Sequence, residues 1–575
     1  MPTFPSSPTT PREQARPIPS LVSPLLPIVL PLVIVAIGLS AVLAKWAPGR
    51  GHGPSPRLRW SEGAAAAGLR FDHRQGGAQG PSALGGAVVV FDFDQDERPD
   101  LYFVNGAPWP WEENLEKRVG RTGALFRNLG QGRFTECTAQ AGLRVEFQGM
   151  AAAAGDFDND GRPDLMVTGL GSHHLFRNLG QGHFEDVSEA MGLRTDDAAW
   201  GAGVVWIDCD GDGWLDLVVV NHVRWSSEIG LEAALATTRN GPSYGAPVGF
   251  VSAFPTVYRN LGGVRFAVLA DGAGLRDIDP ETRRPVPFPL GVTPVDANGD
   301  ARLDLLITYQ DRGPSLFLNR GGRFERQTAG RERLQEGTSA GLASASGLAF
   351  ATSPSDSRSR RILALAAQAL PVRAEEGIEL TSRLAGAVAD FDFDGREEWI
   401  SAGSVAANQL KSSETRGGER APPRLLWWEG ARSGTMPLID SQGARWTSSL
   451  TARGVAAADV DGDGDVDLVL AQNEGSPVLL INELRGDAPW LRIRLVATRS
   501  HPDAGGARVE VHTPRRILSR TVAPAMSFLA QSESTLTFGL GEDARVRKLV
   551  IHWPSGRRQE VTSVTLNRSL VITEP

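Results

Sequence analysis

The amino-acid sequence predicts an all-β protein whose body is a β-propeller followed by a small β-domain. Glycine (65) and proline (38) are abundant among the 575 residues, and turn signals follow one another at short intervals. An apolar strand, an acidic loop and a second apolar strand recur six times along the chain. Radial repetition of short sheets lets a chain of this length fold around such repeats, so we expect a propeller.

The first expected element is an N-terminal membrane anchor. Residues 1–17 form a tail, and no charged side chain occurs from Ile18 to Ala44. At about 1.5 Å per residue this apolar run can cross a hydrocarbon core of about 30 Å. We therefore expect residues 18–46 to be an uncleaved transmembrane helix, followed by a Gly/Pro linker over residues 47–59. A cleavable signal peptide is the alternative, because Val42 and Ala44 are small enough for a cleavage site.

The propeller is expected over residues 60–486. Leu125–Leu143 and Leu175–Leu193 are near copies that each read as strand, Asn/Gly turn, strand. One acidic-loop hairpin plus one such hairpin makes a four-stranded blade. Residues Gly347–Gln368 follow the strand pattern without its acids and would be a degenerate blade that binds no metal. We thus expect seven blades, with six or eight left open.

Each acidic loop places oxygen ligands at relative positions 1, 3, 5 and 9. The predicted ligands are Asp92, Asp94, Asp96 and Asp100; Asp156, Asp158, Asp160 and Asp164; Asp208, Asp210, Asp212 and Asp216; Asp296, Asn298, Asp300 and Asp304; Asp390, Asp392, Asp394 and Glu398; and Asp459, Asp461, Asp463 and Asp467. Glycine at position 6 permits a sharp turn in four loops, while Glu97 and Ala301 stand there in the first and fourth, whose sites we expect to be weaker.

This spacing predicts about six structural Ca²⁺ sites. Alternating side chains in a tight loop can converge on one ion, as in the first half of an EF-hand loop. Oxygen ligands without histidine or cysteine argue against zinc and copper, and magnesium demands a stricter octahedron. One such loop alone could be a solvated acidic turn, but six in register favour metal. Sites of extracellular affinity, about 10⁻⁴–10⁻³ M, would not fill in the cytosol, which places the body in the periplasm or outside the cell.

The repeats resemble FG-GAP (VCBS) repeats, the units of the integrin α-subunit propeller. Gly506–Val511, Phe528–Gly541 and Val550–Gly556 resemble an ASPIC/UnbV domain, expected here over residues 487–575 as a small antiparallel β-domain. The combination resembles bacterial members of the cartilage acidic protein (CRTAC) family. That resemblance implies calcium binding outside the cell and a role in interaction or adhesion, and it supplies no established reaction. Family members often carry cysteines in the loop that here reads Ser243–Pro247, so a disulfide there is in doubt.

The sequence therefore favours a membrane-anchored binding protein without catalytic residues or an organic cofactor. The expected partner is a protein or a carbohydrate, recognised by the long insertion His222–Pro255 or by the C-terminal domain. Trp109, Trp111 and Trp225 suggest stacking on sugars, although a packing role is at least as plausible. The alternative is a propeller enzyme with an unrecognised active site, since Gly337–Gly341 matches a nucleophile-elbow pattern without its strand and helix context.

Charge and cysteine content exclude other classes of function. The net charge is −8 and no basic stripe is present, so nucleic acid is not an expected partner. The two cysteines, Cys137 and Cys209, match no zinc or redox spacing and are expected to be small buried residues, with a single bridge left open. His173 and His174 lack a metal-ligand partner at helical spacing, so we expect them in a solvated turn beside a hairpin.

Overall fold

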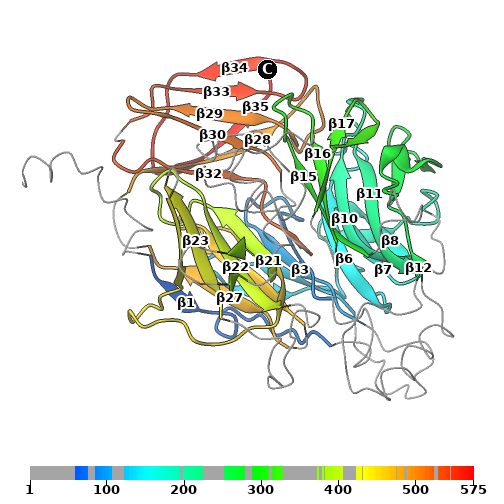
Figure 1. Cartoon of the computed structure of the whole chain (residues 1–575), viewed down its shortest axis with the longest axis horizontal. Helices are drawn as coiled ribbons and strands as arrows, with labels where there is room; N and C mark the ends of the chain where they lie inside the picture. The colour runs from blue at the N-terminus through cyan, green and yellow to red at the C-terminus, as the bar shows by residue number, and fades with distance from the viewer. Residues whose placement is uncertain are drawn as a thin grey trace, which may run out of the picture. The chain divides into compact units, whose positions relative to one another are not determined.

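The computed structural model describes residues 58–575 apart from 75–84, 107–121, 194–198, 225–250, 279–287, 310–313, 328–371, 374–378, 381–382, 406–421, 430–431, 474, 485–487, 524–528 and 544. In this part of the chain nearly all regular structure is β-strand, as predicted, and the repeats form a β-propeller-like fold (Figure 1). The predicted seventh blade, most of the insertion and the tryptophans Trp109, Trp111 and Trp225 lie outside the described residues.

The repeats fold into six four-stranded antiparallel sheets, or blades, and in the first five the strands follow one another in chain order. The first four are β2 (Val88–Phe91), β3 (Asp100–Phe103), β4 (Ala124–Asn128) and β5 (Phe134–Glu136); β6 (Gly149–Gly155), β7 (Asp164–Gly169), β8 (His173–Gly180) and β9 (His183–Asp186); β10 (Ala199–Ile207), β11 (Asp216–Arg224), β13 (Thr256–Asn260) and β14 (Phe266–Val268); and β15 (Pro289–Val295), β16 (Asp304–Tyr309), β17 (Ser315–Asn319) and β18 (Phe324–Arg326). The short β12 (Val251–Ser252) also pairs with β11.

The last two described blades come after the segment where the seventh was expected. They are β21 (Arg383–Ala389), β22 (Glu398–Val405), β23 (Arg424–Glu429) and β24 (Arg432–Pro437); and β25 (Ala452–Ala458), β26 (Asp467–Gln472), β27 (Val478–Asn482) and β1 (Trp60–Glu62). Between them and β18, the structure describes a small ladder of β19 (Val372–Arg373) and β20 (Glu379–Leu380).

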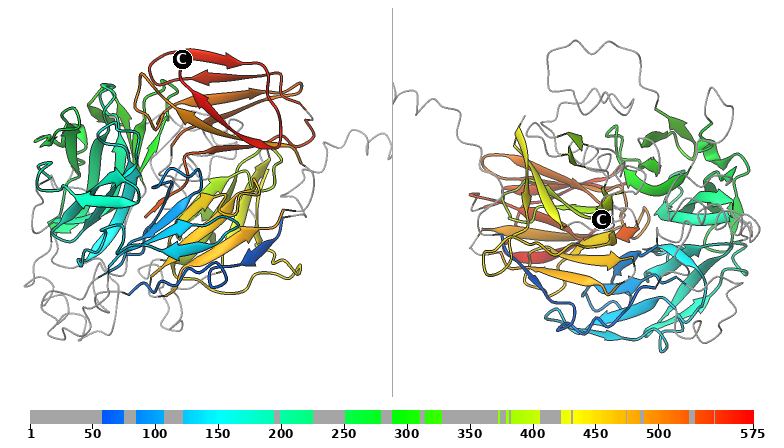
Figure 2. Two further views of the ribbon diagram at one scale, coloured as in Figure 1. Left: turned by 180° about the vertical axis from the view of Figure 1, so that it is seen from behind. Right: turned by 60° about the horizontal axis from the view of Figure 1, so that its bottom comes forward.

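The last blade is completed by the first strand of the described chain. β1 pairs with β27 in the register Trp60↔Asn482 to Glu62↔Leu480, so the beginning of the repeat region closes onto its end. The first strands of consecutive blades pack together: β2 lies between β25 and β6, and β10 lies between β6 and β15. The blue, cyan and green sheets accordingly follow one another in chain order in Figure 2.

The inner strands are buried on both faces, and every residue of β6, β10 and β25 is buried. Valine, leucine, isoleucine, alanine and phenylalanine side chains of neighbouring blades fill the space between the sheets. One cluster joins the first three blades and includes Phe157, Trp206 and Phe266. A second joins β21–β23 to the last blade, where the ring of Trp60 packs edge-on against Phe391 at 5.7 Å. Burial of both faces keeps the acidic loops at the strand ends in a fixed relation to one another.

The C-terminal part forms two further sheets around its own core. One contains β32 (Leu536–Gly539), β28 (Trp490–Val496) and β35 (Arg568–Thr573), and the other contains β30 (Ile517–Thr521), β29 (Arg508–His512), β33 (Lys548–His552) and β34 (Arg558–Val561). The prediction of an antiparallel domain holds for most pairs. It misses the parallel pairing of β28 with β35, which spans six residue pairs.

The expectation of a single-pass membrane anchor requires correction. No helix among the described residues is long and apolar enough to cross a membrane, because they fold into strands and a three-residue 3-10 turn, Gly272–Gly274. The predicted span, residues 18–46, lies outside the described residues.

Candidate metal-binding loops

Every acidic loop joins the first strand of a blade to the second. Position 1 comes just after the first strand, and position 9 is the first residue of the second strand, as Asp156 and Asp164 illustrate for β6 and β7. The two strands pair directly on either side, for example through Gly155↔Asp164. The pairing brings the ends of the loop together, so its carboxylates are forced into a small volume.

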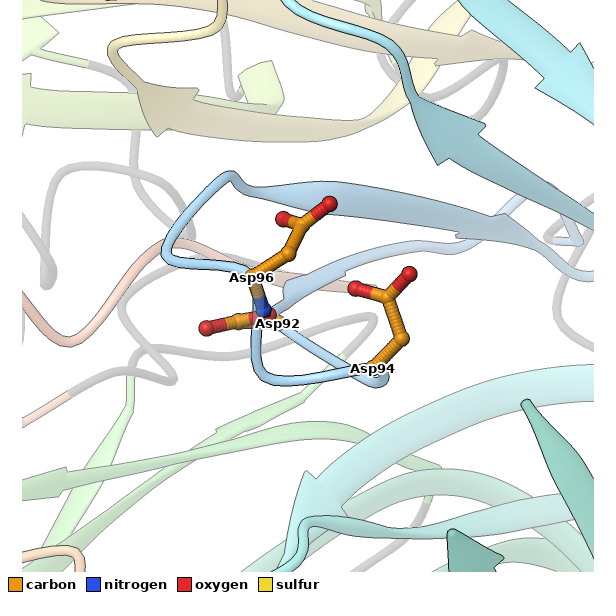
Figure 3. A group of neighbouring side chains, drawn as sticks. All are labelled: Asp92, Asp94 and Asp96. Atoms are coloured by element: carbon orange, nitrogen blue, oxygen red, sulfur yellow. The ribbon is translucent and has the colours of Figure 1, made fainter. Parts of the chain in front are cut away.

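In five of the six loops, three carboxylates meet within 4.8 Å of one another. The groups are Asp92, Asp94 and Asp96; Asp156, Asp158 and Asp164; Asp208, Asp210 and Asp212; Asp390, Asp392 and Glu398; and Asp459, Asp461 and Asp467. Figure 3 shows the first, with Asp94 and Asp96 projecting to the same side of the loop. The predicted residues are therefore brought together in part: positions 1 and 3 always join, and either position 5 or position 9 completes the group.

The fourth loop forms no such group among the described acidic residues. Asn298 stands at its third position, and Ala301 at its sixth adopts φ 68°. Asn298 donates from Nδ2 to Asp300 Oδ2 at 3.1 Å, which uses one of the remaining carboxylates internally. This loop offers one negative charge fewer than its neighbours.

A left-handed backbone at two positions gives all six loops the same shape. Position 6 has positive φ in every loop, including the non-glycine residues Glu97 (66°) and Ala301 (68°). Position 4 has positive φ as well, as in Gln95 (61°), Asn159 (56°) and Phe393 (58°). The carboxylate at position 1 accepts hydrogen bonds from the N–H groups of this turn. Asp156 accepts from Asp160 N at 3.0 Å and from Gly161 N at 2.8 Å.

The carboxylate at position 9 has a structural task in addition to any ligation. Asp164 is fully buried, and its two oxygens accept from Phe157 N at 3.1 Å and Asn178 N at 2.7 Å. Burial raises the pKa of Asp164 to about 9 and that of Asp100 to about 8. A carboxyl group with so high a pKa is charged at neutral pH only if a cation stabilises it.

The asparagine of the repeated Arg-Asn-Leu-Gly turn joins neighbouring blades. Asn178 Nδ2 donates to Phe93 O, at position 2 of the preceding acidic loop, at 2.8 Å. Asn128 and Asn260 of the same motif make the same bond to Val460 and Phe157, at 2.9 and 2.8 Å. Asn482 makes it to Phe391 at 2.9 Å, although its neighbours are Ile481 and Glu483 and not those of the motif. The sequence predicts this motif only as a turn. The signal available in the sequence was the recurrence of this asparagine, once in each of the first three blades, in the turn that follows the acidic loop.

Two further contacts tie one acidic loop to the next. Gln95 Nε2 donates to Gly161 O at 2.5 Å, and Asn159 Nδ2 donates to Gly213 O at 3.0 Å. Both donors are at position 4 and both acceptors at position 6. The first three loops are thus connected in series through the turn residues that hold their shape.

Arginines of the same turns partly neutralise the first three loops. Arg127 Nε lies 2.5 Å from Asp94 Oδ2, Arg177 contacts Asp158 at 2.5 Å, and Arg259 pairs with Asp210. The equivalent residue in the fourth blade is Leu318, and the acidic loop of that blade has the uncharged Asn298 at its third position. Among the first four blades, an arginine is therefore present where position 3 is an aspartate and is absent where it is an asparagine.

The C-terminal domain reaches the fifth and sixth loops. Asp390 Oδ2 accepts from Gly539 N at 2.9 Å and lies 3.4 Å from the Arg520 guanidinium, while Arg492 lies 3.5 Å from Asp459. Burial raises the pKa of Asp390 well above its usual range. Asp390 Oδ1 is buried and has no hydrogen-bond partner among the described residues. An orphaned carboxylate oxygen inside a group of three acids fits a bound cation.

The histidines and cysteines singled out in the sequence have structural surroundings. His173 and His174 begin β8, so the expected solvated turn is wrong for them. Burial lowers the pKa of His173 to about 4, and His174 Nδ1 lies 2.8 Å from Asp186. Cys137 is half-buried and Cys209 buried; both are free thiols, so the bridge left open is absent.

Comparison with known proteins agrees with the resemblance seen in the residues. Residues 92–167 and 156–219 match the FG-GAP-like repeat, and residues 497–575 match the ASPIC and UnbV family. The chain is 29% identical over 154 residues to cartilage acidic protein 1 of Xenopus tropicalis and 30% identical over 128 residues to that of Homo sapiens. These matches cover 25% and 21% of this chain, and 24% and 19% of the relatives' own lengths.

Solved structures overlap with the chain only loosely. An Agrocybe aegerita lectin that recognises non-reducing terminal N-acetylglucosamine has a TM-score of 0.30 at 14% identity, covering 69% of this chain and 80% of the lectin chain. The extracellular domain of a putative hybrid two-component system from B. thetaiotaomicron has a TM-score of 0.31 at 10% identity, covering 84% and 51%. Superposition scores of this size establish neither a shared fold nor a shared ligand.

Proposed function

Because the chain is a member of the cartilage acidic protein-like family, with FG-GAP-like repeats and an ASPIC and UnbV domain, we propose that it is an extracellular calcium-binding propeller that acts as a binding or adhesion module and catalyses no reaction. In this proposal metal ions stabilise the propeller scaffold, and a separate surface of the protein recognises the partner.

The five converging carboxylate groups carry the calcium part of this proposal. Two ionised carboxylates about 4 Å apart repel by roughly 4 kcal/mol at an effective dielectric of about 20, so a divalent cation stabilises each group. Calcium accepts six to eight oxygen ligands in a flexible arrangement, and every acid of these groups offers oxygen. At about 1 mM calcium and a dissociation constant of about 0.1 mM, each site would add roughly 1.4 kcal/mol to stability.

A melting experiment on the full chain tests calcium binding. Addition of a chelator is expected to lower Tm, and excess calcium, but not an equal concentration of magnesium, is expected to restore it. Asp158→Asn should reduce this response, since Asp158 belongs to one of the converging groups. Glu325→Gln is a matched control, because Glu325 is an exposed acid that pairs with Arg320 and belongs to none of the converging groups. A Tm unmoved by chelator would remove calcium from the proposal.

Repeated exposed leucines favour a protein as the partner. Leu129, Leu179 and Leu261 occupy the same turn of the first three blades, and their exposed fractions are 50%, 50% and 45%. Each turn packs beside the acidic loop of the preceding blade, as where Gly263 approaches Asp158. Apolar side chains repeated along one edge are suited to a protein surface, whereas sugars prefer aromatic faces and polar groups.

Affinity capture with the purified chain tests recognition. A protein ligand should be lost when Leu129, Leu179 and Leu261 are all changed to serine, while Tm changes little because these side chains are exposed. Binding to a glycan array that survives the triple change would assign the ligand to carbohydrate instead. Turnover of a polysaccharide, abolished by one substitution outside the acidic loops, would overturn the non-catalytic part of the proposal.

A further inference from the structure

One short strand of the C-terminal part leaves its own sheets and joins the propeller. β31 (Ala530–Gln531) pairs in parallel with β2, the first strand of the first blade, in the register Val88↔Ala530 and Val89↔Gln531. Val88 N donates to Leu529 O at 3.1 Å. The inner edge of β2 is therefore covered by a segment more than four hundred residues away in the sequence.

The same segment bonds to the first strands of two other blades. The side-chain amide of Gln531 accepts from Ala154 N at 2.8 Å and donates to Ala154 O at 3.0 Å, which reproduces backbone pairing along β6. On the other side, Ala457 N of β25 donates to Ser532 Oγ at 3.0 Å, and Glu533 N donates to Ala457 O at 3.1 Å. Consecutive residues thus satisfy both polar groups of one residue on each flanking strand.

These three strands meet where the ring of blades closes. β25 belongs to the last blade, β2 to the first and β6 to the second. Other described contacts across this junction are the three-residue pairing of β1 with β27, the Asn128–Val460 hydrogen bond, the bridge between His73 and Gly475, and an apolar cluster that joins β2 and β3 to β25 and β26. Small residues make room for the segment, since a Cβ at Gly454 would lie 2.5 Å from Leu529 O.

We propose that the segment Leu529–Glu533, which we call the latch, holds the ring of blades closed in addition to the pairing of β1 with β27. The inner edges of β25, β2 and β6 are then a docking surface, and its occupant is the chain's own C-terminal domain. The latch holds the first and last blades together, and the propeller and the C-terminal domain open as one cooperative unit. Without it, the unpaired groups of Val88, Ala154 and Ala457 would face the centre of the ring.

The latch anchors itself through buried charge as well as backbone bonds. Glu533 Oε1 accepts from Asp459 N at 3.1 Å, and the Arg492 guanidinium holds both Glu533 oxygens at 2.9 and 2.7 Å. Arg492 belongs to β28 of the C-terminal domain and is 5% exposed. The latch is therefore fixed to the propeller on one side and to its parent domain on the other.

Native-state hydrogen exchange on the full chain, at constant saturating calcium, tests the proposal. Gln531→Ala removes two hydrogen bonds, so amides of β6 should exchange roughly 30-fold faster. If the latch fastens the ring, β2, β25 and β1 should accelerate with β6. Gln442→Ala is the control, since Gln442 is an exposed residue on the surface of the same propeller. Acceleration confined to β6, or none at all, would overturn the latch.

A milder variant keeps the test decisive if Gln531→Ala does not fold. Ser532→Ala removes the single bond from Ala457 N and should accelerate exchange about fivefold, again across β25, β2 and β6 together. Thermal unfolding supplies an independent readout: one transition is expected for the natural chain, and separation into two for the latch variants. Two well-separated transitions in the natural chain would contradict a shared unit. Calcium-induced stabilisation is read separately, so loss of calcium binding alone leaves this result unaffected.

Discussion

Removal of one inter-blade asparagine should show how strongly neighbouring blades hold each other. Asn178 is fully buried, and its side chain makes three hydrogen bonds: Nδ2 donates to Phe93 O at 2.8 Å and to Pro163 O at 3.1 Å, and Oδ1 accepts from Gly180 N at 2.9 Å. At about 1 kcal/mol net for each bond, Asn178→Ala loses about 3 kcal/mol. The orphaned Phe93 carbonyl raises the expected loss to about 3–5 kcal/mol.

The fourth blade offers a matched control. Asn319 is equally buried, but its Nδ2 donates at 3.3 Å to Leu303 O within its own blade. The link to the preceding blade is made instead by the backbone, where Gly322 N donates to Cys209 O at 2.7 Å. Asn319 Oδ1 also accepts from Gly321 N at 3.0 Å and from Gly322 N at 3.2 Å. Asn319→Ala leaves the backbone link between blades in place, so its loss should be smaller than that of Asn178→Ala, about 2–3 kcal/mol.

Urea unfolding of both variants at fixed, saturating calcium measures the difference. The midpoint should fall further for Asn178→Ala than for Asn319→Ala, with unchanged dependence on urea because the surface exposed on unfolding is the same. An equal loss in the two variants would show that the bond to Phe93 O contributes nothing between blades. No loss for Asn178→Ala would refute the whole account of this motif.

Three further outcomes are expected. Ala301→Gly should stabilise the chain by about 1 kcal/mol in urea unfolding, because alanine is strained at φ 68°; a loss of stability would contradict this. Without calcium, the free energy of unfolding should fall as pH rises from about 5 to 9, because the pKa of Asp164 is about 9 in the folded state, above its value in the unfolded chain, so that the folded state binds the extra proton. The calcium-induced gain in Tm should therefore grow from pH 6 to pH 8. A gain independent of pH would argue against these acids as ligands. Arg520→Met should cost about 3–5 kcal/mol in the same unfolding assay, since it leaves Asp390 and Glu397 buried without their guanidinium partner; retention of full stability would show that this pairing is dispensable.

Local chemistry made the blades and loops predictable from the sequence. Apolar runs on either side of Asp156 and Asp164 define two paired strands, and position 6 glycines such as Gly161 mark the turn between them. The positive φ at position 4 was missed because Gln95 and Phe393 carry no such signal in their residue type. The spacing is the same in all six loops, so it does not determine whether position 5 or position 9 joins the carboxylate group.

Long-range contacts were beyond the reach of pattern reasoning. Gln531 reads as one more polar residue in a strand, and only the folded chain brings its amide to Ala154. The parallel pairing of β28 with β35 likewise joins segments that are distant in the sequence. Such pairings carry no periodic signature, because neither residue type nor spacing specifies the partner strand.

The series of contacts between the first three loops has a consequence for how the protein would sense calcium. Gln95 and Asn159 each donate a hydrogen bond to the turn of the next loop. An ion that orders one loop therefore lowers the conformational entropy that is lost when the neighbouring loop is ordered. Uptake along these blades is then expected to be positively cooperative. The chain would respond to calcium as a threshold, with occupancy switching over a narrow range of concentration and a Hill coefficient above one.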